Sequence, residues 1–424
     1  MADPREQRER IPVAQPSPKL PLAGLRIIDA GNMVAAPFAT VLLADFGADV
    51  IKVEHPTMGD GERKLAPIKK QADTGESVPL WWKNGARNKR CVTLNLGKPE
   101  GAAVFKELVA TADVVVENYR PGTFERWGIG YDDLKQVNPR IILLRISGFG
   151  QTGPYRERGG FGRVAEAMGG LTNLIGEKDG APMTPGIPLG DLITGLVGSW
   201  ATMVALYHRD ALGGEGQEID LGLYESVFRI LEFDPIQYDQ VDDPVRRVHT
   251  REGNQLSYVA PSDMFRTSDR KWLTLAASTQ NIFEDLCRAI GQEELIADPR
   301  FADNPARVNH REEINGIVRE WITRHTLAEV AEIFDPRGVP YALVFDMRDV
   351  FSNEQFLARE MLVRVLDKQL GDAVVQNVVP KFSKTPGAIS HLGPKLGEHN
   401  DEVYGGLLGY SQERLQQLRD AGVI

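Results

Sequence analysis

Residues 185–200, PGIPLGDLITGLVGSW, place one carboxylate between a glycine and an apolar run. Asp191 precedes apolar residues at helical spacing, so one role for it is to cap the N-terminus of a helix. The other role is that of a nucleophile at a glycine-flanked helix N-terminus, where the helix dipole favours negative charge. An aspartate is ionised at neutral pH and needs no general base to attack. This stretch alone leaves both roles open.

The sequence contains no common hydrolase or metal-binding motif. It has no GxSxG, no P-loop and no HExxH, and its two cysteines, Cys91 and Cys287, form no zinc pattern. None of the seven histidines lies within residues 56–207. A histidine base close in sequence to Asp191 is therefore missing, and we expect no metal site.

Three further segments carry residues that suit ligand binding. Residues 81–96, WWKNGARNKRCVTLNL, form either a solvated loop or a phosphate clamp, because guanidinium groups match phosphate oxygens. Residues 116–128, VENYRPGTFERWG, follow a predicted strand, and ligands of α/β sheets bind at such ends. Residues 147–170 are rich in glycine, which favours a mobile lid or a surface loop.

The elements that must position these residues alternate as strands and helices between residues 25 and 228. This alternation predicts a parallel sheet covered by helices on both faces. The first turn between strand and helix, DAGNMVAAP, lacks the GxGxxG glycines, although Glu54 ends the second strand where an acid could bind a ribose. The pattern therefore disfavours binding of a nicotinamide dinucleotide.

Composition limits the partners and the compartment. The 424 residues carry a formal net charge of −10, which disfavours nucleic acid and anionic membranes as partners. The N-terminal stretch has no apolar core typical of a signal peptide, and no apolar run is long enough to suggest a membrane span. We expect a cytoplasmic protein with reduced cysteines.

Several motifs occur in the order seen in class III CoA-transferases: PLAGLRIIDAG, APFATVLLADFGADVIKVEHP, NKRCVTLNL, VVVENYRPGTFERWGIG, NPRIILLRISGFGQTGP, GIPLGDLITG and GEGQEIDLGLYES. The sequence thus resembles the family of formyl-CoA:oxalate and carnitine CoA-transferases over residues 20–400. The resemblance implies that Asp191 is the catalytic nucleophile. It implies CoA as acyl-CoA substrate, bound by Met33, Val34, His55, Asn88, Lys89, Arg90, Leu94, Asn118, Tyr119 and Arg126. Val34 departs from the glutamine of the formyl-CoA enzymes, and His55 from a frequent arginine.

The resemblance also implies the architecture. It predicts an α/β fold with a Rossmann-like large domain and a smaller α+β domain, in an interlocked dimer. The expected segments are a flexible tail (1–20), the N-terminal part of the large domain with Asp191 (21–233), a linker (234–262), the small domain (263–345), and a linker with a C-terminal segment that returns to the large domain (346–424). A homodimer is expected, and a heteromer with a paralogous subunit stays open.

The implied reaction moves CoA from an acyl-CoA donor to a carboxylic acid through an aspartyl anhydride and an aspartyl-CoA thioester. Our prediction is succinyl-CoA or a similar donor with a dicarboxylate acceptor. The candidates to recognise its second carboxylate are arginines of the glycine-rich loop and of the linker, namely Arg156, Arg158, Arg163, Arg246, Arg247 and Arg251. Alternatives are an aromatic acid acceptor, an intramolecular CoA-transfer isomerase and an α-methylacyl-CoA racemase. The racemase branch carries a histidine after SGFGQTGP, where this sequence has Phe161-Gly162-Arg163.

Overall fold

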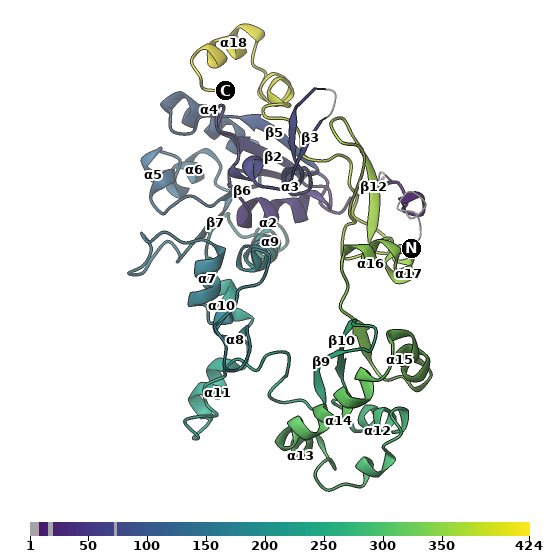
Figure 1. Ribbon diagram of the computed structural model, residues 1–424. Helices are drawn as coiled ribbons and strands as arrows, with labels where there is room; N and C mark the ends of the chain where they lie inside the picture. Colours follow the sequence, from purple (N-terminus) through teal and green to yellow (C-terminus); the bar gives the residue numbers. More distant parts are fainter. Residues whose placement is uncertain (1–7, 16–19, 72–73) are drawn as a thin grey trace. The chain divides into compact units, whose positions relative to one another are not determined.

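The computed structural model describes residues 8–15, 20–71 and 74–424 (Figure 1). The chain divides into two compact units. The large unit comprises Met1–Leu171, Thr184–Pro235 and Asn353–Ile424, and the small unit comprises Thr172–Met183 and Ile236–Ser352. Residues 172–183, which the sequence assigned to the large domain, therefore lie in the small unit. They are held there by backbone contacts such as the bond from the Gly253 N–H to the Gly176 carbonyl.

The large unit is built on a six-stranded parallel sheet, as the alternation of strands and helices predicted. Its strands, in spatial order, are β5 (Lys89–Thr93), β2 (Asp49–Glu54), β1 (Arg26–Asp29), β6 (Val114–Glu117), β7 (Ile142–Ser147) and β8 (Glu218–Gly222). From β1 the chain first extends the sheet on one side, through β2 and β5, and then on the other side, through β6, β7 and β8. The strand order therefore reverses between β1 and β6. In open α/β sheets this reversal creates the crevice in which ligands bind.

Both faces of the sheet are buried because neighbouring residues of each strand enter different cores. Ile27 and Ile28 of β1 point into opposite cores, and Leu143 and Leu144 of β7 do the same. One core is covered by α4 (Pro99–Ala110), α6 (Tyr131–Val137) and α18 (Gln412–Asp420), the last contributed by the chain's C-terminal segment (Figure 1). The other is covered by α2 (Ala35–Ala44), α9 (Leu189–Ala211) and α10 (Leu223–Arg229).

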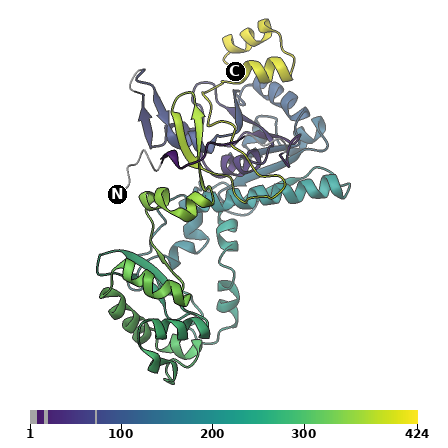
Figure 2. The same cartoon turned by 90° about the vertical axis from the view of Figure 1, so that its right-hand side faces the viewer.

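The long helix α9, visible along its length in Figure 2, lies directly against α2. Small residues make this close approach possible. A Cβ at Gly195 would lie 2.9 Å from the carbonyl oxygen of Ala35 in α2, and one at Gly198 would lie 3.5 Å from the Cβ of Ala39 in α2 and 3.1 Å from Leu144 of β7. The start of α9 is thereby fixed next to the start of α2, which follows directly on the first strand of the sheet.

The remaining elements of the large unit lie around this sheet. They are η1 (Gly61–Lys64), β3 (Ile68–Lys70), β4 (Ser77–Pro79), α3 (Leu80–Gly85), α5 (Thr123–Arg126), α7 (Gly162–Met168), α17 (Glu354–Ala358), β12 (Leu362–Asp367), β13 (Gly371–Gln376) and η4 (Asp401–Leu407). Strands β12 and β13 form an antiparallel ribbon. The C-terminal segment thus belongs to the large unit.

The small unit has its own core between an antiparallel sheet and helices. The sheet runs β11 (Tyr341–Leu343), β10 (Trp272–Ala276) and β9 (Ser262–Arg266). Its helices are α12 (Gln280–Ala289), η2 (Glu293–Ile296), α13 (Asn304–Asn309), α14 (Arg311–Thr323), α15 (Leu327–Phe334), η3 (Asp335–Arg337) and α16 (Met347–Ser352). Two further helices span the boundaries between the units, α8 (Leu171–Leu174) and α11 (Asp234–Gln240).

Candidate active site

Asp191 is the third residue of α9 and not its cap. The N-cap position is Pro188, and no side chain caps this end of the helix. The capping interpretation is therefore wrong. Asp191 instead occupies the first turn, where the free backbone N–H groups of the helix favour a negative charge.

Two glycines allow the Asp191 carboxylate to lie against the backbone of α7. A Cβ at Gly162 would lie 2.2 Å from Oδ2 of Asp191, and a Cβ at Gly190 would lie 2.8 Å from the Gly162 carbonyl oxygen. The Gly162 N–H donates a hydrogen bond to the carboxylate. This close contact explains why a glycine precedes Asp191, because any side chain at residue 190 would push α9 away from α7.

A second carboxyl group lies beside the first. Glu166 of α7 is fully buried, and its Oε1 accepts a hydrogen bond of 2.8 Å from the Gly190 N–H. That N–H is therefore engaged by Glu166. Burial and the charge of Glu166 together raise the pKa of Asp191 to about 6, against the opposing effect of the hydrogen bond from Gly162. The nucleophile is ionised above about pH 6 and loses its charge below it.

The glycine-rich segment before α7 forms a loop closed at its base. A Cβ at Gly148 would lie 2.8 Å from the Gly160 Cα, so the two backbones touch. Within the loop, Phe149 packs edge-on against Tyr155, and the Arg158 guanidinium lies over the Tyr155 ring. The loop therefore leads directly into Gly162, the residue that contacts Asp191. Its role as a lid stays a prediction.

The turn between β1 and α2 joins the Asp191 region to a pocket at the strand ends. The Asn32 N–H donates to Oδ1 of Asn118, and the Asn118 amide donates back to the Asn32 carbonyl, each at 2.7 Å. These bonds bridge the ends of β1 and β6, where the strand order reverses. The turn ends at the start of α2, against which α9 packs.

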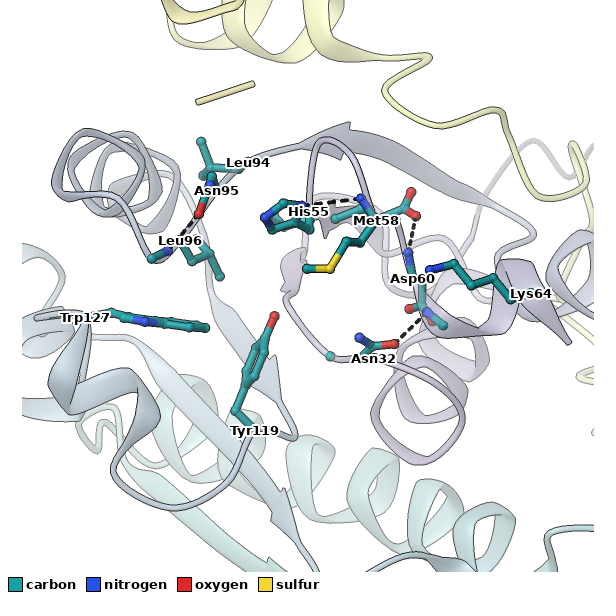
Figure 3. A pocket seen from close by; sticks show the side chains of 16 residues that line it. Asn32, His55, Met58, Asp60, Lys64, Leu94, Asn95, Leu96, Tyr119 and Trp127 are labelled. Atoms are coloured by element: carbon teal, nitrogen blue, oxygen red, sulfur yellow. Dashed lines mark hydrogen bonds between the residues drawn. The ribbon is translucent and has the colours of Figure 1, made fainter. Parts of the chain in front are cut away.

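The pocket itself has a volume of about 480 Å³ and opens at the carboxyl ends of β5, β2, β1 and β6 (Figure 3). The Tyr119 side chain points into the pocket, and the Trp127 ring lines the pocket wall next to Tyr119. Its lining residues are Gly31, Asn32, Val53, Glu54, His55, Met58, Gly59, Asp60, Gly61, Lys64, Leu94, Asn95, Leu96, Gly97, Tyr119 and Trp127. The position is the one where doubly wound folds bind their ligands.

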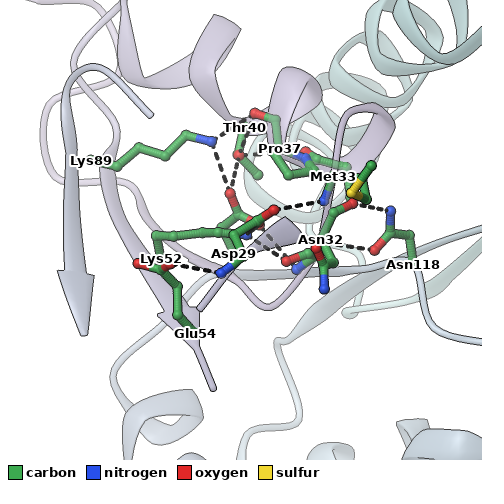
Figure 4. Close-up of polar contacts among 12 residues, drawn as sticks. Asp29, Asn32, Met33, Pro37, Thr40, Lys52, Glu54, Lys89 and Asn118 are labelled. Atoms are coloured by element: carbon green, nitrogen blue, oxygen red, sulfur yellow. Dashed lines mark hydrogen bonds and ion pairs between the residues drawn. The ribbon is translucent and has the colours of Figure 1, made fainter. Parts of the chain in front are cut away.

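A buried ionic cluster holds the wall of this pocket in place (Figure 4). Lys52 pairs with Asp60 at 2.7 Å and with Asp29 at 3.5 Å, and Lys89 pairs with Asp29 at 2.9 Å. Asp60 Oδ1 accepts the N–H of Met33, a residue held at a φ of 65°. Such a left-handed residue persists only where surrounding contacts fix it. The cluster thus fixes the turn that connects the pocket with α2.

The structure brings together half of the predicted CoA-binding residues. His55, Leu94 and Tyr119 line the pocket, Met33 belongs to the turn that borders it, and Asn118 hydrogen-bonds to that turn from the end of β6. Val34, directly before α2, is buried. Arg126 is exposed at the end of α5, next to the pocket residue Trp127, and hydrogen-bonds Thr123.

Three predicted CoA-binding residues of segment 81–96, Asn88, Lys89 and Arg90, lie elsewhere. Lys89 is fully buried and is neutralised by Asp29, while Arg90 pairs with Asp49 and Glu402. Asn88 donates to Asp45 and to the Ala388 carbonyl. None of the three is among the described residues that line the pocket. A run of charges in the sequence does not reveal which of them have buried partners.

Two details of the pocket escaped sequence reasoning. Glu54 does not stand free for a ribose, because Arg63 binds both of its carboxylate oxygens at 2.6 and 2.7 Å. Lys64, which follows in η1, is exposed and lines the pocket. The only sequence signal for Lys64 was its place in the loop after the second strand.

These features can be compared with known proteins. A family model described as CoA-transferase family III matches residues 22–400. The chain belongs to CoA-transferase family III. It is therefore a class III CoA-transferase, as the motifs predicted. No group of three His, Cys, Asp or Glu side chains that could hold a metal ion occurs among the described residues of the transferase.

Relatives of this transferase match it over nearly its full length. The succinyl-CoA–L-malate CoA-transferase beta subunit of Chloroflexus aurantiacus is 45% identical over 96% of this chain and 98% of its own. The succinyl-CoA–D-citramalate CoA-transferase of the same organism is 40% identical over 96% and 99%. The crystal structure of a CAIB/BAIF family protein from Brucella suis has a TM-score of 0.78 at 33% identity, covering 92% of this chain and 100% of that one.

We predict that Gly162→Ala removes activity while the fold is kept. The new methyl group would occupy the space of the Asp191 carboxylate, and a displacement of about 1 Å can cost about 10²-fold in rate. The matched control is Gly186→Ala in the loop before α9, where a Cβ would meet nothing within 4 Å. CoA-transfer rates and thermal unfolding should be measured for both. Equal activities of the two variants would contradict the placement of Asp191.

Proposed function

We propose that the transferase moves CoA from succinyl-CoA to a dicarboxylic acid, with Asp191 as the covalent nucleophile. The observation that carries the proposal is the Asp191 carboxylate held at the start of α9 by the backbone of Gly162. The turn beside α2 connects this carboxylate with a pocket at the strand ends. Two relatives, at 45% and 40% identity, are named for succinyl-CoA with L-malate or D-citramalate.

The reaction follows from carboxylate chemistry. Asp191 attacks the thioester carbonyl of the donor, the C–S bond breaks, and CoA leaves as a thiolate, which gives an aspartyl anhydride. The thiolate then attacks the Asp191 acyl carbon and releases the donor acid, which leaves an aspartyl-CoA thioester. The acceptor acid attacks this thioester, which releases the CoA thiolate and forms a second anhydride. The thiolate then attacks the acyl carbon of the acceptor in this anhydride, which gives the CoA ester of the acceptor and frees Asp191. Exclusion of water preserves each activated intermediate.

The pocket at the strand ends is the proposed CoA site. Its volume of about 480 Å³ falls in the range of small-molecule and cofactor sites. His55, Leu94, Asn118 and Tyr119 keep the roles that the family resemblance gave them, together with Met33. Among the described lining residues, Lys64 alone is a lysine or arginine, so we add it as a contact for the CoA phosphates.

For the second carboxylate of the acid substrate we propose Arg163. Of the three arginines at residues 156–163, Arg156 pairs with Glu157 and Arg158 stacks on Tyr155. Arg163 is exposed and follows directly on Gly162, the contact residue of Asp191. A guanidinium can bind a carboxylate through two parallel hydrogen bonds, which would favour dicarboxylates over aromatic acids.

The exposed face of α9 supports a dimer. Leu196, Trp200, Val204 and Tyr207 recur at helical spacing, and Trp200 is 67% exposed. By length and composition α9 could also cross a membrane, but it packs against α2, α10 and β7 in the core of the large unit. Contiguous exposed apolar surface marks association sites, and we propose that a second copy, or a paralogous subunit, covers it in the family's interlocked arrangement.

For the location of the protein we propose the cytoplasm. Both cysteines are free and buried, in keeping with a reducing compartment.

A screen of donor and acceptor pairs tests the proposed function. With succinyl-CoA as donor, we expect transfer to a four- to six-carbon dicarboxylate such as L-malate, citramalate or glutarate, detected by chromatography of the CoA esters. Asp191→Asn should lower the rate by at least about 10³-fold, because it removes the covalent route. Efficient transfer by the Asn variant would contradict the role of Asp191 as nucleophile. Conversion of one CoA ester without any acceptor acid would favour the racemase or isomerase alternative.

Lys64→Gln should raise the KM for succinyl-CoA by about three- to tenfold with little change in kcat, since it removes one charged contact to the nucleotide. Lys69→Gln, on the exposed strand β3 of the same unit, is the matched control. The succinyl ester of dephospho-CoA identifies the group that is bound. If Lys64 binds the 3′-phosphate, wild type and variant should have the same KM for that ester. An unchanged KM for succinyl-CoA itself would contradict the contact.

The transferase should be a dimer down to nanomolar concentration in sedimentation experiments, because a large apolar interface makes folding and assembly inseparable. Trp200→Glu should abolish the dimer or the soluble yield, since it places a charge in that interface. Leu366→Glu is the control, at an apolar residue of β12 that is 82% exposed. A folded wild-type monomer at nanomolar concentration would refute the proposed assembly.

A further inference from the structure

Glu166 is a buried carboxyl group that has no part in the steps above. Its side chain is fully buried, Oε1 accepts the Gly190 N–H, and Oε2 has no hydrogen-bond partner among the described residues. A buried oxygen without a partner is costly to stability. The neighbour of this group is Asp191, which carries the same charge. Such an arrangement costs stability, which indicates that Glu166 is kept for the chemistry of the site and not for the fold.

We propose that Glu166 is a positioning residue that destabilises the ionised form of Asp191 and thereby favours its acylated form. The inference rests on the proposed function, in which Asp191 attacks the thioester. Through Oε1, Glu166 also holds the Gly190 N–H and so fixes the first turn of α9. One side chain thus sets both the position of the nucleophile and its electrostatic energy.

The movement of negative charge during the reaction explains why Glu166 favours the acylated form of Asp191. Before attack, two carboxylates lie side by side in a largely buried site. When an Asp191 oxygen bonds to the thioester carbon, the C–S bond breaks and its electron pair leaves with sulfur. The negative charge then resides on CoA, and the anhydride at Asp191 is neutral. The later aspartyl-CoA thioester is also neutral, so both covalent states are free of the repulsion from Glu166.

Other charged groups near α9 do not provide this effect. Helix α2 has no ionisable side chain, and the other elements packed against α9 carry Arg163 (α7), Tyr224, Glu225 and Arg229 (α10), Arg145 (β7), and Glu218 and Asp220 (β8). Arg145 is occupied by Glu117, Glu125 and Glu218. Among the charged groups on these elements, Glu166 is the one whose charge raises the pKa of Asp191. Burial of Asp191 raises its pKa as well.

Glu166→Gln is the direct test, because glutamine keeps the size and an oxygen for the Gly190 N–H and loses the charge. The acid limb of kcat/KM for succinyl-CoA should move to lower pH by at least about half a unit, while burial of Asp191 keeps it above the range of an exposed aspartate. The fraction of enzyme acylated at equilibrium should fall by about three- to tenfold. The KM for succinyl-CoA should stay the same, because Glu166 does not line the CoA pocket.

A stability measurement tests the same repulsion without activity. Because the folded-state pKa of Asp191 lies above its unfolded value, stability is lost as pH rises through about 6. Asp191→Asn should therefore raise the Tm at pH 8 by roughly 2–5 °C and leave it almost unchanged at pH 4. In the Glu166→Gln background this gain should shrink.

The two experiments separate the inference from the proposed function. An acid limb that does not move, or an equal gain in Tm in both backgrounds, overturns the role of Glu166 even if Asp191 is the nucleophile. Full activity of Asp191→Asn refutes the proposed function, and the Tm comparison still decides whether Glu166 repels residue 191.

Discussion

The contact between the Asp191 carboxylate and the backbone of Gly162 constrains the rest of the site. A charged group can lie this close to a neighbouring helix only if both Gly162 and Gly190 lack side chains. The small residues of α9 that face α2 continue the same constraint, since they let α9 lie against the start of α2. The nucleophile is thereby fixed to the turn that borders the CoA pocket. The site is made precise by close backbone packing, and the hydrogen bond from Gly162 then orients the carboxylate.

Charge is distributed unevenly between the two halves of the large unit's site. Around the pocket, three buried carboxylates are paired: Asp29 and Asp60 with lysines, and Glu54 with Arg63. Around Asp191 they are not paired, and Glu166 adds a second negative charge. The paired half provides a rigid wall, whereas the unpaired half raises the energy of the free nucleophile. Active sites often combine a satisfied scaffold with a destabilised reacting group in this way.

Much of the fold could be predicted because its signals are local. Alternating apolar strands and helices predicted the parallel sheet on which the large unit is built. The order of motifs predicted the family. Pairings across the sheet were not predictable: nothing in the run around Lys89 shows that Asp29, 60 residues away, neutralises it. The same holds for Glu166, which meets Asp191 only because α7 packs on α9.

The most direct test of the central claim is to trap the covalent intermediate. The enzyme should be incubated with succinyl-CoA without an acceptor acid and then treated with borohydride or hydroxylamine, followed by peptide mass spectrometry. Borohydride reduces an aspartyl thioester, and hydroxylamine converts an activated carboxyl group to a hydroxamate. We predict a modification at Asp191 in the peptide spanning residues 185–200, with loss of activity, that appears only after exposure to the acyl-CoA. Enzyme that stays fully active after both treatments, with no modified Asp191 peptide, would show that acyl transfer does not pass through this aspartate.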